Sequence, residues 1–275
     1  KTLTELYKTE FVREWQRFMQ GLNVTGFENF PAAVARMNRL GDPKDSPVAT
    51  LMQALFDQTS WDNPSILNER LAKTQKGFVD WIKSSILRMA PSRVEVKVDV
   101  AGPNGAIPMG PIGREFAGVQ RIMLARDGNP TPMTLYLGHL SKVRTRFNQL
   151  SNQGDAGPGA RVLLAATLDG GASELSDALR HVDEQMLVNM TDSAKASIRP
   201  VLVRPLIEAM AVLVEPTELE INRVWEAQVR GPFERALAAK YPFDVHSRIE
   251  ATEAEIGKTF GPGGTYVRQP KKPWW

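Results

Sequence analysis

Apolar residues recur every three or four positions through most of this chain, which is the spacing of one face of an α-helix. The longest such stretch spans residues 219–264. Its apolar positions are Ile221, Val224, Trp225, Val229, Phe233 and Leu237. Pro216 suits the first turn of this helix, and Thr217 with Glu220 resembles a capping box. The pattern predicts a long amphipathic helix that buries one face.

The end of this helix is marked by its proline and glycine residues. Pro232 predicts a kink after Gly231, because proline lacks the N–H that a helix interior uses. Tyr241-Pro242-Phe243 then stops the helix, and a short second helix is expected over residues 248–259. The glycine-rich stretch 261–264 predicts a turn that redirects the chain, with an anion cradle as the less favoured alternative.

The rest of the chain reads as helices joined by short turns. Four helices are expected in residues 1–91, where Thr2 and Glu5 form a capping box and Ser46-Pro47 opens a further helix. Residues 114–264 predict a second helical domain, in which Thr131-Pro132 caps a long helix. The sequence therefore predicts a mainly α fold, a multi-helix, two-lobed helical bundle with a small β element.

The β element is expected in residues 92–113. Val94, Val96, Val98 and Val100 alternate with Glu95, Lys97 and Asp99. This period of two is typical of a half-buried strand, which needs a partner strand from a β region further along or from a second copy of the chain. An extended surface linker is the other interpretation, because residues 101–113 are rich in glycine and proline.

The composition of the chain excludes several classes of site and partner. The chain has 275 residues with 42% hydrophobic and 24% charged residues, which is ordinary for a globular protein. Its net charge of +3 comes from basic and acidic residues that are interleaved, so nucleic acid is not indicated as a partner. There is no cysteine, which excludes disulfides and zinc–thiolate sites. No apolar run approaches the roughly 18 to 20 residues that span a bilayer.

Candidate chemistry is sparse. Gly257-Lys258-Thr259 fails as a phosphate loop, because Thr252 stands where that motif needs a glycine. The three histidines, His139, His181 and His246, have no metal-ligand spacing, and no nucleophile motif occurs. We therefore predict no catalytic residues, no metal and no cofactor, and a protein that is not an enzyme. The alternative function is a helical ligand- or peptide-binding module. Its apolar pocket between helices would be lined by Trp15, Trp61, Phe78 and Trp81.

Several motifs resemble a known protein family. They are Asn222-Arg223-Val224-Trp225, Val229-Arg230-Gly231-Pro232-Phe233, Lys240-Tyr241-Pro242-Phe243, Ala251-Thr252 and Phe260-Gly261-Pro262-Gly263-Gly264. In these residues the chain resembles the C-terminal periplasmic part of the IcmF/TssM proteins, inner-membrane components of bacterial type VI secretion systems. The residues that the resemblance marks as structural or partner-contacting are Trp225, Pro232, Phe233, Tyr241, Pro242, Phe243, Phe260, Gly261, Pro262, Gly263 and Gly264.

The resemblance carries expectations about function. It implies a structural component of the type VI secretion membrane complex that binds the outer-membrane lipoprotein TssJ, works with the inner-membrane protein TssL and self-assembles. It places the chain in the periplasmic region of a membrane-anchored protein. Family members continue past the glycine loop into a β-rich domain, so residues 265–275 are expected to be a remnant of that domain. The expected division of the chain is a helical domain at 1–91, a strand or linker at 92–113 and a second helical domain at 114–264.

Overall fold

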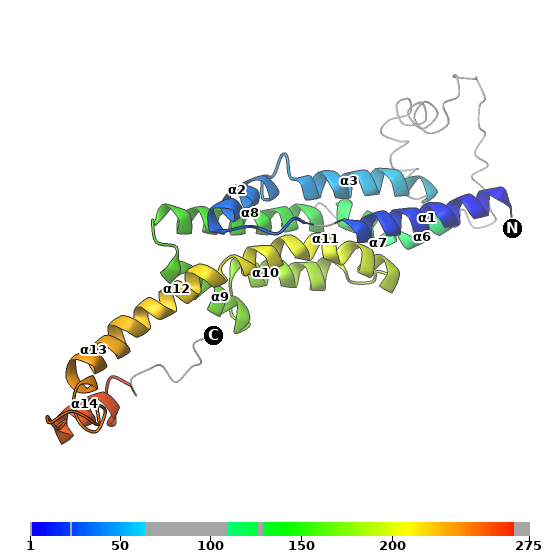
Figure 1. Ribbon diagram of the computed structural model, residues 1–275. Helices are drawn as coiled ribbons and strands as arrows, with labels where there is room; N and C mark the ends of the chain where they lie inside the picture. Colours follow the sequence, from blue (N-terminus) through cyan, green and yellow to red (C-terminus); the bar gives the residue numbers. More distant parts are fainter. Residues whose placement is uncertain (1, 23, 64–108, 126–128, 267–275) are drawn as a thin grey trace. The chain divides into compact units, whose positions relative to one another are not determined.

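The chain is described here by a computed structural model, which covers residues 2–22, 24–63, 109–125 and 129–266. These residues are mainly helical, so the predicted mainly α fold is confirmed (Figure 1). An isolated bridge between Tyr241 and Glu250 is the β pairing recorded among them. The predicted strand at 94–100, the tail 267–275 and the ring positions Phe78 and Trp81 lie outside the described residues.

The described residues contain the following α-helices. They are α1 (Leu3–Gly21), α2 (Phe30–Leu40), α3 (Pro47–Thr59), α6 (Pro111–Glu115), α7 (Ala117–Met123), α8 (Pro132–Asn152), α9 (Gly157–Leu168), α10 (Glu174–His181), α11 (Asp192–Ala211), α12 (Val214–Trp225), α13 (Gly231–Phe233) and α14 (Glu253–Phe260). A 3-10 turn, η1 (Ser60–Asp62), and three π-helical turns, η2 (Val182–Met186), η3 (Glu226–Arg230) and η4 (Glu234–Ala238), complete the helical segments.

The helices form two compact units that are each assembled from three chain segments. Unit 1 comprises Lys1–Thr25, Arg39–Ser141 and Ala178–Pro205, and unit 2 comprises Gly26–Asn38, Lys142–Asp177 and Leu206–Trp275. The boundaries fall inside α2, α8, α10 and α11, so each of these helices contributes residues to both units. Each unit has a hydrophobic core of its own.

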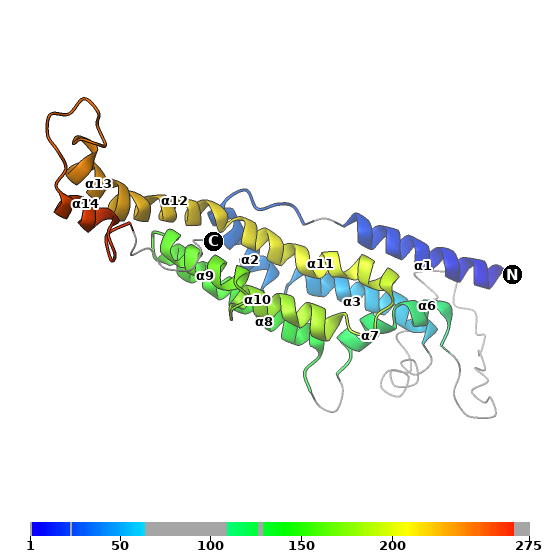
Figure 2. The ribbon, with the colours of Figure 1, turned by 90° about the horizontal axis from the view of Figure 1, so that it is seen from below.

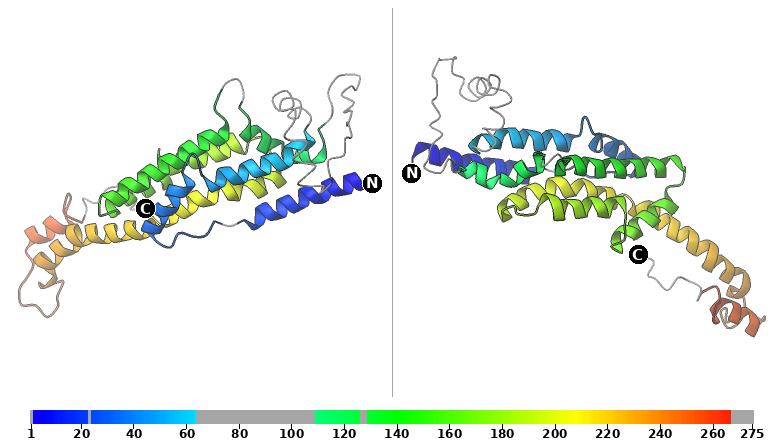
Figure 3. Two further views of the ribbon diagram at one scale, coloured as in Figure 1. Left: turned by 90° about the horizontal axis from the view of Figure 1, so that it is seen from above. Right: turned by 180° about the vertical axis from the view of Figure 1, so that it is seen from behind.

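In unit 1, α1 packs on α6, and α3 packs on α7 and η1 (Figure 3). Helix α1 starts at the predicted capping box, where Glu5 N donates to Thr2 Oγ1 at 3.4 Å and Thr2 N donates to Glu5 Oε2 at 3.0 Å. Fully buried side chains fill the centre of the unit. They include Met19, Met52, Leu55, Phe56, Ile112, Phe116, Ile122, Tyr136, Leu140 and Leu202. The hydroxyl of Tyr136 donates to the Leu202 carbonyl at 2.7 Å, which satisfies the polar atom of a ring that is fully enclosed.

In unit 2, α2 packs on the second half of α8, where the ring of Phe30 stacks on Phe147 at a centroid distance of 5.4 Å. Helix α9 crosses the same part of α8 closely, because a Cβ at Gly159 would overlap the side chain of Leu150. Helix α9 also packs along α12. The enclosed apolar side chains are Ala33, Met37, Val143, Phe147, Leu150, Ala160, Leu163, Leu175, Leu206, Ala209 and Leu213.

The capping box predicted at Thr217 is wrong. Helix α12 begins earlier, at Val214, and its preceding residue Leu213 makes no side-chain cap. Thr217 is already inside the helix, with its N–H donating to the Leu213 carbonyl at 3.1 Å. Glu220 bonds Arg223 at 2.6 Å instead of reaching back to Thr217. The helix starts early because only two residues separate it from α11, so no extended residue is left for Thr217 to cap.

Pro232 lies in a helix that continues past it (Figure 2). Arg230, Gly231, Phe233 and Glu234 all have helical backbone angles. The π-helical turns η3 and η4 flank the proline, and such turns accommodate a residue that lacks an N–H. Pro232 therefore lies between two local changes in helical winding, and the kink stays a prediction.

The short helix expected over residues 248–259 is α14, which begins five residues later than predicted. Thr252 and Glu255 form a capping box that fixes its start. The preceding residues make a loop closed at its base, where Tyr241 N donates to the Ile249 carbonyl at 2.8 Å and Ala251 N donates to the Tyr241 carbonyl at 2.9 Å. The loop folds α14 back beside η4 (Figure 2).

Candidate functional site: an aromatic cap on unit 2

The motif residues predicted from the sequence meet at one end of unit 2, where five aromatic rings form a connected cluster. We call this cluster the aromatic cap; its members are Trp225, Phe233, Phe243, Phe260 and Tyr266. The ring of Phe260 lies 5.8 Å from Phe243 in a stacked arrangement, and Phe233 meets Phe243 edge-on at 5.4 Å. Tyr266 lies 5.6 Å from Phe260 and 6.4 Å from Trp225. The rings join the long helix, the loop and α14.

The glycine loop after α14 directs Tyr266 into the cap. Thr265 N donates to the Lys258 carbonyl at 3.0 Å, and Tyr266 N donates to the Thr259 carbonyl at 2.9 Å. Gly263 has a φ of +79°, which glycine adopts without strain. A Cβ at Gly264 would lie 2.7 Å from the Thr259 carbonyl oxygen, too close for any other residue. The loop is thus a turn, as predicted, and the N–H groups of Gly261 and Gly264 donate to backbone carbonyls.

An ion pair holds α14 against the end of the long helix. Lys240 Nζ lies 2.5 Å from Glu255 Oε1, and Thr252 N donates to Glu255 Oε2 at 3.0 Å. The Lys240 ammonium and then the two Thr252 hydrogen bonds lower the pKa of Glu255 to about 2. The carboxylate therefore caps α14 and also ties it to Lys240, two residues after η4.

The cap also presents apolar surface to solvent. Phe243 is 38% exposed, Phe260 is 39% exposed and Tyr266 is 51% exposed. Val245 and Ile249, on the neighbouring loop, are exposed to 71% and 64%. Pro242 is exposed as well, and Pro232 is half-buried. Clustered exposed apolar side chains of this kind mark protein–protein contact sites more often than isolated ones do.

Sequence reasoning missed Tyr266, which completes the cap. Its place depends on the turn at residues 261–264, which brings the chain back to Trp225. The signal available in the sequence was an aromatic residue two positions after a glycine-rich turn that itself follows Phe260. That signal is weak, because spacing along the chain does not state how far the turn reverses it.

The aromatic residues named for the alternative function lie elsewhere, in unit 1. The ring of Phe11 is 6.4 Å from Trp15 and 6.2 Å from Trp61, so it occupies the space between the two tryptophans. Lys8 Nζ lies 5.6 Å from the centre of the Trp61 ring. These contacts are those of packed side chains, and they do not favour a ligand pocket at Trp15 and Trp61.

The histidines take separate positions. The rings of His139 and His181 are 5.1 Å apart in unit 1, and His181 Nε2 lies 2.9 Å from the Pro132 carbonyl oxygen. His246 is on the loop before α14. Within the described ranges, no group of three histidine, cysteine or carboxylate side chains is placed to hold a metal ion. Across the same residues, none of the helices combines the length and the apolar character needed to span a bilayer.

Comparison with known proteins finds similarity to one family. A family model described as IcmF-related, intracellular multiplication and human macrophage-killing, matches residues 1–60. The type VI secretion system component TssM1 of Pseudomonas aeruginosa is 22% identical over 278 residues, covering 98% of this chain and 23% of the relative. A chain of a solved type VI secretion system membrane core complex superimposes with a TM-score of 0.68 at 19% identity, covering 97% of this chain and 46% of that one. These matches support a relationship of the chain to the IcmF/TssM family.

A second solved structure, of a type VI membrane complex, has a TM-score of 0.63 at 18% identity, and the match covers 97% of this chain. At these identities the likeness to the solved structures concerns the fold. The chain spans about a quarter of the curated relative and less than half of either solved chain. The family model covers α1 to α3, whereas the aromatic cap lies in the region that the alignment with TssM1 also covers.

Proposed function

We propose that this IcmF/TssM chain is a structural module of a type VI secretion membrane complex, in the periplasmic region of a membrane-anchored protein, and is not an enzyme. The observation that carries the proposal is the likeness of 97% of the chain to part of a type VI secretion membrane core complex. Packed helical units suit such a role, because they hold exposed surfaces at fixed positions without reactive side chains.

The proposed partners are the lipoprotein TssJ, the inner-membrane protein TssL and further copies of the same protein. Within this chain the aromatic cap is the proposed contact surface, and its exposed neighbours Val245 and Ile249 extend it. Aromatic side chains that are half-buried by one another are already ordered, so a partner would bind them at a small cost in side-chain entropy. Large rings of this type supply much of the free energy at protein–protein interfaces.

The test is a calorimetric titration of the chain, and of the full-length protein, with the cognate TssJ and the soluble part of TssL. Val245→Glu and Ile249→Glu place a charge beside the cap at side chains that are 71% and 64% exposed, so folding should be unaffected. We expect each variant to weaken binding about tenfold or more if the cap is buried in the interface. Leu135→Glu, at a side chain 46% exposed in unit 1, is the matched control and should bind as the wild type does.

Secretion provides the second readout. The full-length protein with Val245→Glu and Ile249→Glu should fail to restore type VI secretion in a strain that lacks its own copy, while the Leu135→Glu protein restores it. Equal secretion by all three proteins would show that the aromatic cap is not part of the interface. Absence of binding to TssJ, to TssL and to itself by the full-length protein would overturn the proposed partners. Catalytic turnover abolished by a single polar substitution would overturn the structural role.

A further inference from the structure

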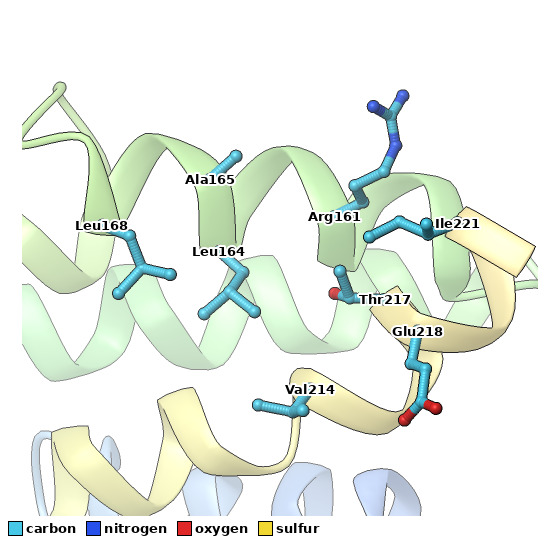
Figure 4. Close-up of a pocket in the computed structure, with 8 residues that line it drawn as sticks. All are labelled: Arg161, Leu164, Ala165, Leu168, Val214, Thr217, Glu218 and Ile221. Atoms are coloured by element: carbon cyan, nitrogen blue, oxygen red, sulfur yellow. The ribbon is translucent and has the colours of Figure 1, made fainter. Parts of the chain in front are cut away.

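A groove in unit 2 lies between α9 and α12 and has a volume of about 330 Å³. Its lining residues from α9 are Arg161, Leu164, Ala165 and Leu168, and those from α12 are Val214, Thr217, Glu218 and Ile221 (Figure 4). Leu168 and Val214 are large aliphatic side chains, yet they are 58% and 52% exposed. An apolar cavity of about 150 Å³ holds a benzene ring, so this groove has room for the larger indole ring of a tryptophan.

The polar side chains of the groove differ in what they indicate about an occupant. Thr217 Oγ1 and Arg161 Nε have no hydrogen-bond partner among the described residues, but both atoms are enclosed and out of reach of a ligand. The Arg161 guanidinium and the Glu218 carboxylate point in opposite directions (Figure 4). Glu218 is exposed, and within the described part of the chain no cation pairs with it. The α12 side of the groove therefore offers a negative charge, which favours a basic occupant.

The α12 side of the groove leads directly to the aromatic cap. Trp225 follows Ile221 by four residues in the same helix, so it continues the lining stripe of α12 by one further turn. The ring of Tyr266 lies 6.4 Å from that of Trp225. Ile221 and Arg161 lie at one end of the groove and Leu168 at the other (Figure 4). Tyr266, the last described residue, is therefore placed next to the Ile221 end of the groove.

The residues that follow Tyr266 have the length to run along the groove. They are Val267, Arg268, Gln269, Pro270, Lys271, Lys272, Pro273, Trp274 and Trp275. Prolines favour extended polyproline II geometry, which advances about 3.1 Å per residue, so Trp274 can lie about 25 Å from Tyr266. At a rise of about 1.5 Å per residue, Val214 lies about 17 Å from Trp225 along α12. The tryptophans of this segment can thus reach Val214 and Leu168.

The chemistry of the segment matches that of the groove. Arg268, Lys271 and Lys272 are basic, and the segment contains no aspartate or glutamate. Its two tryptophans are the largest apolar side chains that a protein has, and each buries about 150–250 Å² when it leaves water. The attachment at Tyr266 also raises the local concentration of the segment to the millimolar range, which a separate partner would have to match.

From these observations we propose that the groove between α9 and α12 binds residues 267–275 of the same chain. The tryptophans of the segment cover Leu168 and Val214, and its lysines lie along Glu218. The bound segment fastens the aromatic cap to α9 and occupies the groove against other partners. This inference rests on the groove and on Tyr266, and it holds whether or not the aromatic cap contacts TssJ.

Engineered cysteine pairs test the contact directly, because the chain has no cysteine of its own. Val214→Cys with Pro273→Cys places one thiol in the groove and one beside the tryptophans. Val162→Cys with Pro273→Cys is the matched control, since Val162 is 55% exposed on α9 but lies outside the groove. We expect the intramolecular disulfide to form about tenfold faster or more in the groove pair, measured by mass spectrometry after addition of glutathione disulfide. Trp274→Ser with Trp275→Ser should remove this difference.

A separate peptide tests the same contact without a disulfide. The chain with Trp274→Ser and Trp275→Ser leaves the groove vacant, so a fluorescein-labelled peptide of residues 267–275 should bind to it in fluorescence anisotropy. The wild-type chain, whose own segment competes, should bind the peptide about tenfold more weakly or less. Adding Leu168→Glu to the vacant chain should abolish binding, whereas Val162→Glu should leave it unchanged. Circular dichroism checks that each variant keeps its helices.

The charge contribution has a test of its own. Glu218→Gln in the vacant chain should weaken binding of the peptide severalfold, because it removes the carboxylate and keeps the size of the side chain. A peptide with Lys271→Ala and Lys272→Ala should bind the vacant chain and its Glu218→Gln variant equally. Glu215→Gln, at an exposed residue of α12 outside the groove, is the matched control and should not change binding.

Three results would overturn the proposal. The first is equal disulfide formation in the groove pair and the control pair, together with no binding of the peptide to the vacant chain. The second is a disulfide that forms between two chains, with a dimer in sedimentation equilibrium, because the occupant is then the segment of a second copy. The third is peptide binding that Leu168→Glu leaves unchanged, because the peptide then binds outside the groove.

Discussion

Replacing Asp62 by alanine should destabilise unit 1, because this carboxylate joins three segments that are distant in the sequence. Lys8 Nζ from α1 lies 2.5 Å from its Oδ1, and Ile112 N in the first turn of α6 donates to its Oδ2 at 2.9 Å. Gly110 N donates to the Asp62 backbone carbonyl at 3.0 Å. Gly110 itself provides no side-chain cap for α6, so Asp62 caps that helix from 50 residues away.

The magnitude follows from the burial of the two partners. The Asp62 side chain is 7% exposed and Lys8 is 21% exposed. A hydrogen bond to a charged group contributes about 1.5–3 kcal/mol, and removing one partner of a fully buried pair costs about 3–5 kcal/mol. In the variant the Lys8 ammonium is hydrated by water, so losing its ion pair lowers the free energy of unfolding by less than the full amount. The Ile112 N–H stays enclosed and loses its acceptor. We expect Asp62→Ala to lower the free energy of unfolding by about 2–4 kcal/mol.

Urea unfolding followed by circular dichroism measures this change, and hydrogen exchange of the Ile112 amide locates it. Asp62→Asn keeps an acceptor for Ile112 but removes the charge, so it should cost about 1–2 kcal/mol and preserve exchange protection at Ile112. Asp45→Ala, at an exposed aspartate before α3, is the control and should lie within about 0.5 kcal/mol of the wild type. A loss below about 1 kcal/mol for Asp62→Ala, with unchanged protection at Ile112, would refute the reasoning.

Three further predictions concern single contacts. The pKa of Glu255 is lowered from 4.5 to about 2, so the stabilisation of α14 should be complete above pH 4.5 and lost as the pH falls through about 2. Lys240→Met removes the ion pair and should abolish the hydrogen-exchange protection of α14 at neutral pH. An unchanged protection profile would contradict this prediction. Tyr136→Phe removes the 2.7 Å hydrogen bond to Leu202 and should cost about 1 kcal/mol in urea unfolding, whereas Tyr7→Phe, 50% exposed, should cost almost nothing. Phe260→Ala breaks three ring contacts and should cost about 1.5–4.5 kcal/mol in the free energy of unfolding, since each pair contributes about 0.5–1.5 kcal/mol. Its loss should appear as faster exchange in α14, and Ile249→Ala is the exposed control.

The helices that the sequence predicted well are those whose ends carry complete local signals. Helix α1 begins at the Thr2–Glu5 capping box, and α8 begins at Pro132 after Thr131, both as predicted. Such signals involve residues three or four apart, so they act before any tertiary packing forms. The same type of signal failed at Thr217, because the preceding helix ends only two residues before α12 and leaves no room for a cap.

The groove between α9 and α12 could not be predicted from the sequence. Leu164 and Leu168 lie in the predicted second helical domain, but periodicity does not state which helix covers which stripe. The groove exists because α9 packs beside α12, a helix that begins about 50 residues further along the chain. Arg161 and Thr217 gave no signal for the same reason, since an unsatisfied polar atom is visible only after its neighbours are placed.

The aromatic cap shows why a motif can support both folding and binding. Phe233 is half-buried between Phe243 and Phe260, so its loss would loosen the loop and α14 together. Val245 and Ile249 point largely into solvent, so charges placed there leave those ring contacts intact. A variant of Phe233 would thus lower stability and any partner affinity in parallel, which makes it uninformative about binding. Substitutions at the exposed positions separate binding from folding, because they change the contact surface and leave the buried rings that hold it in place.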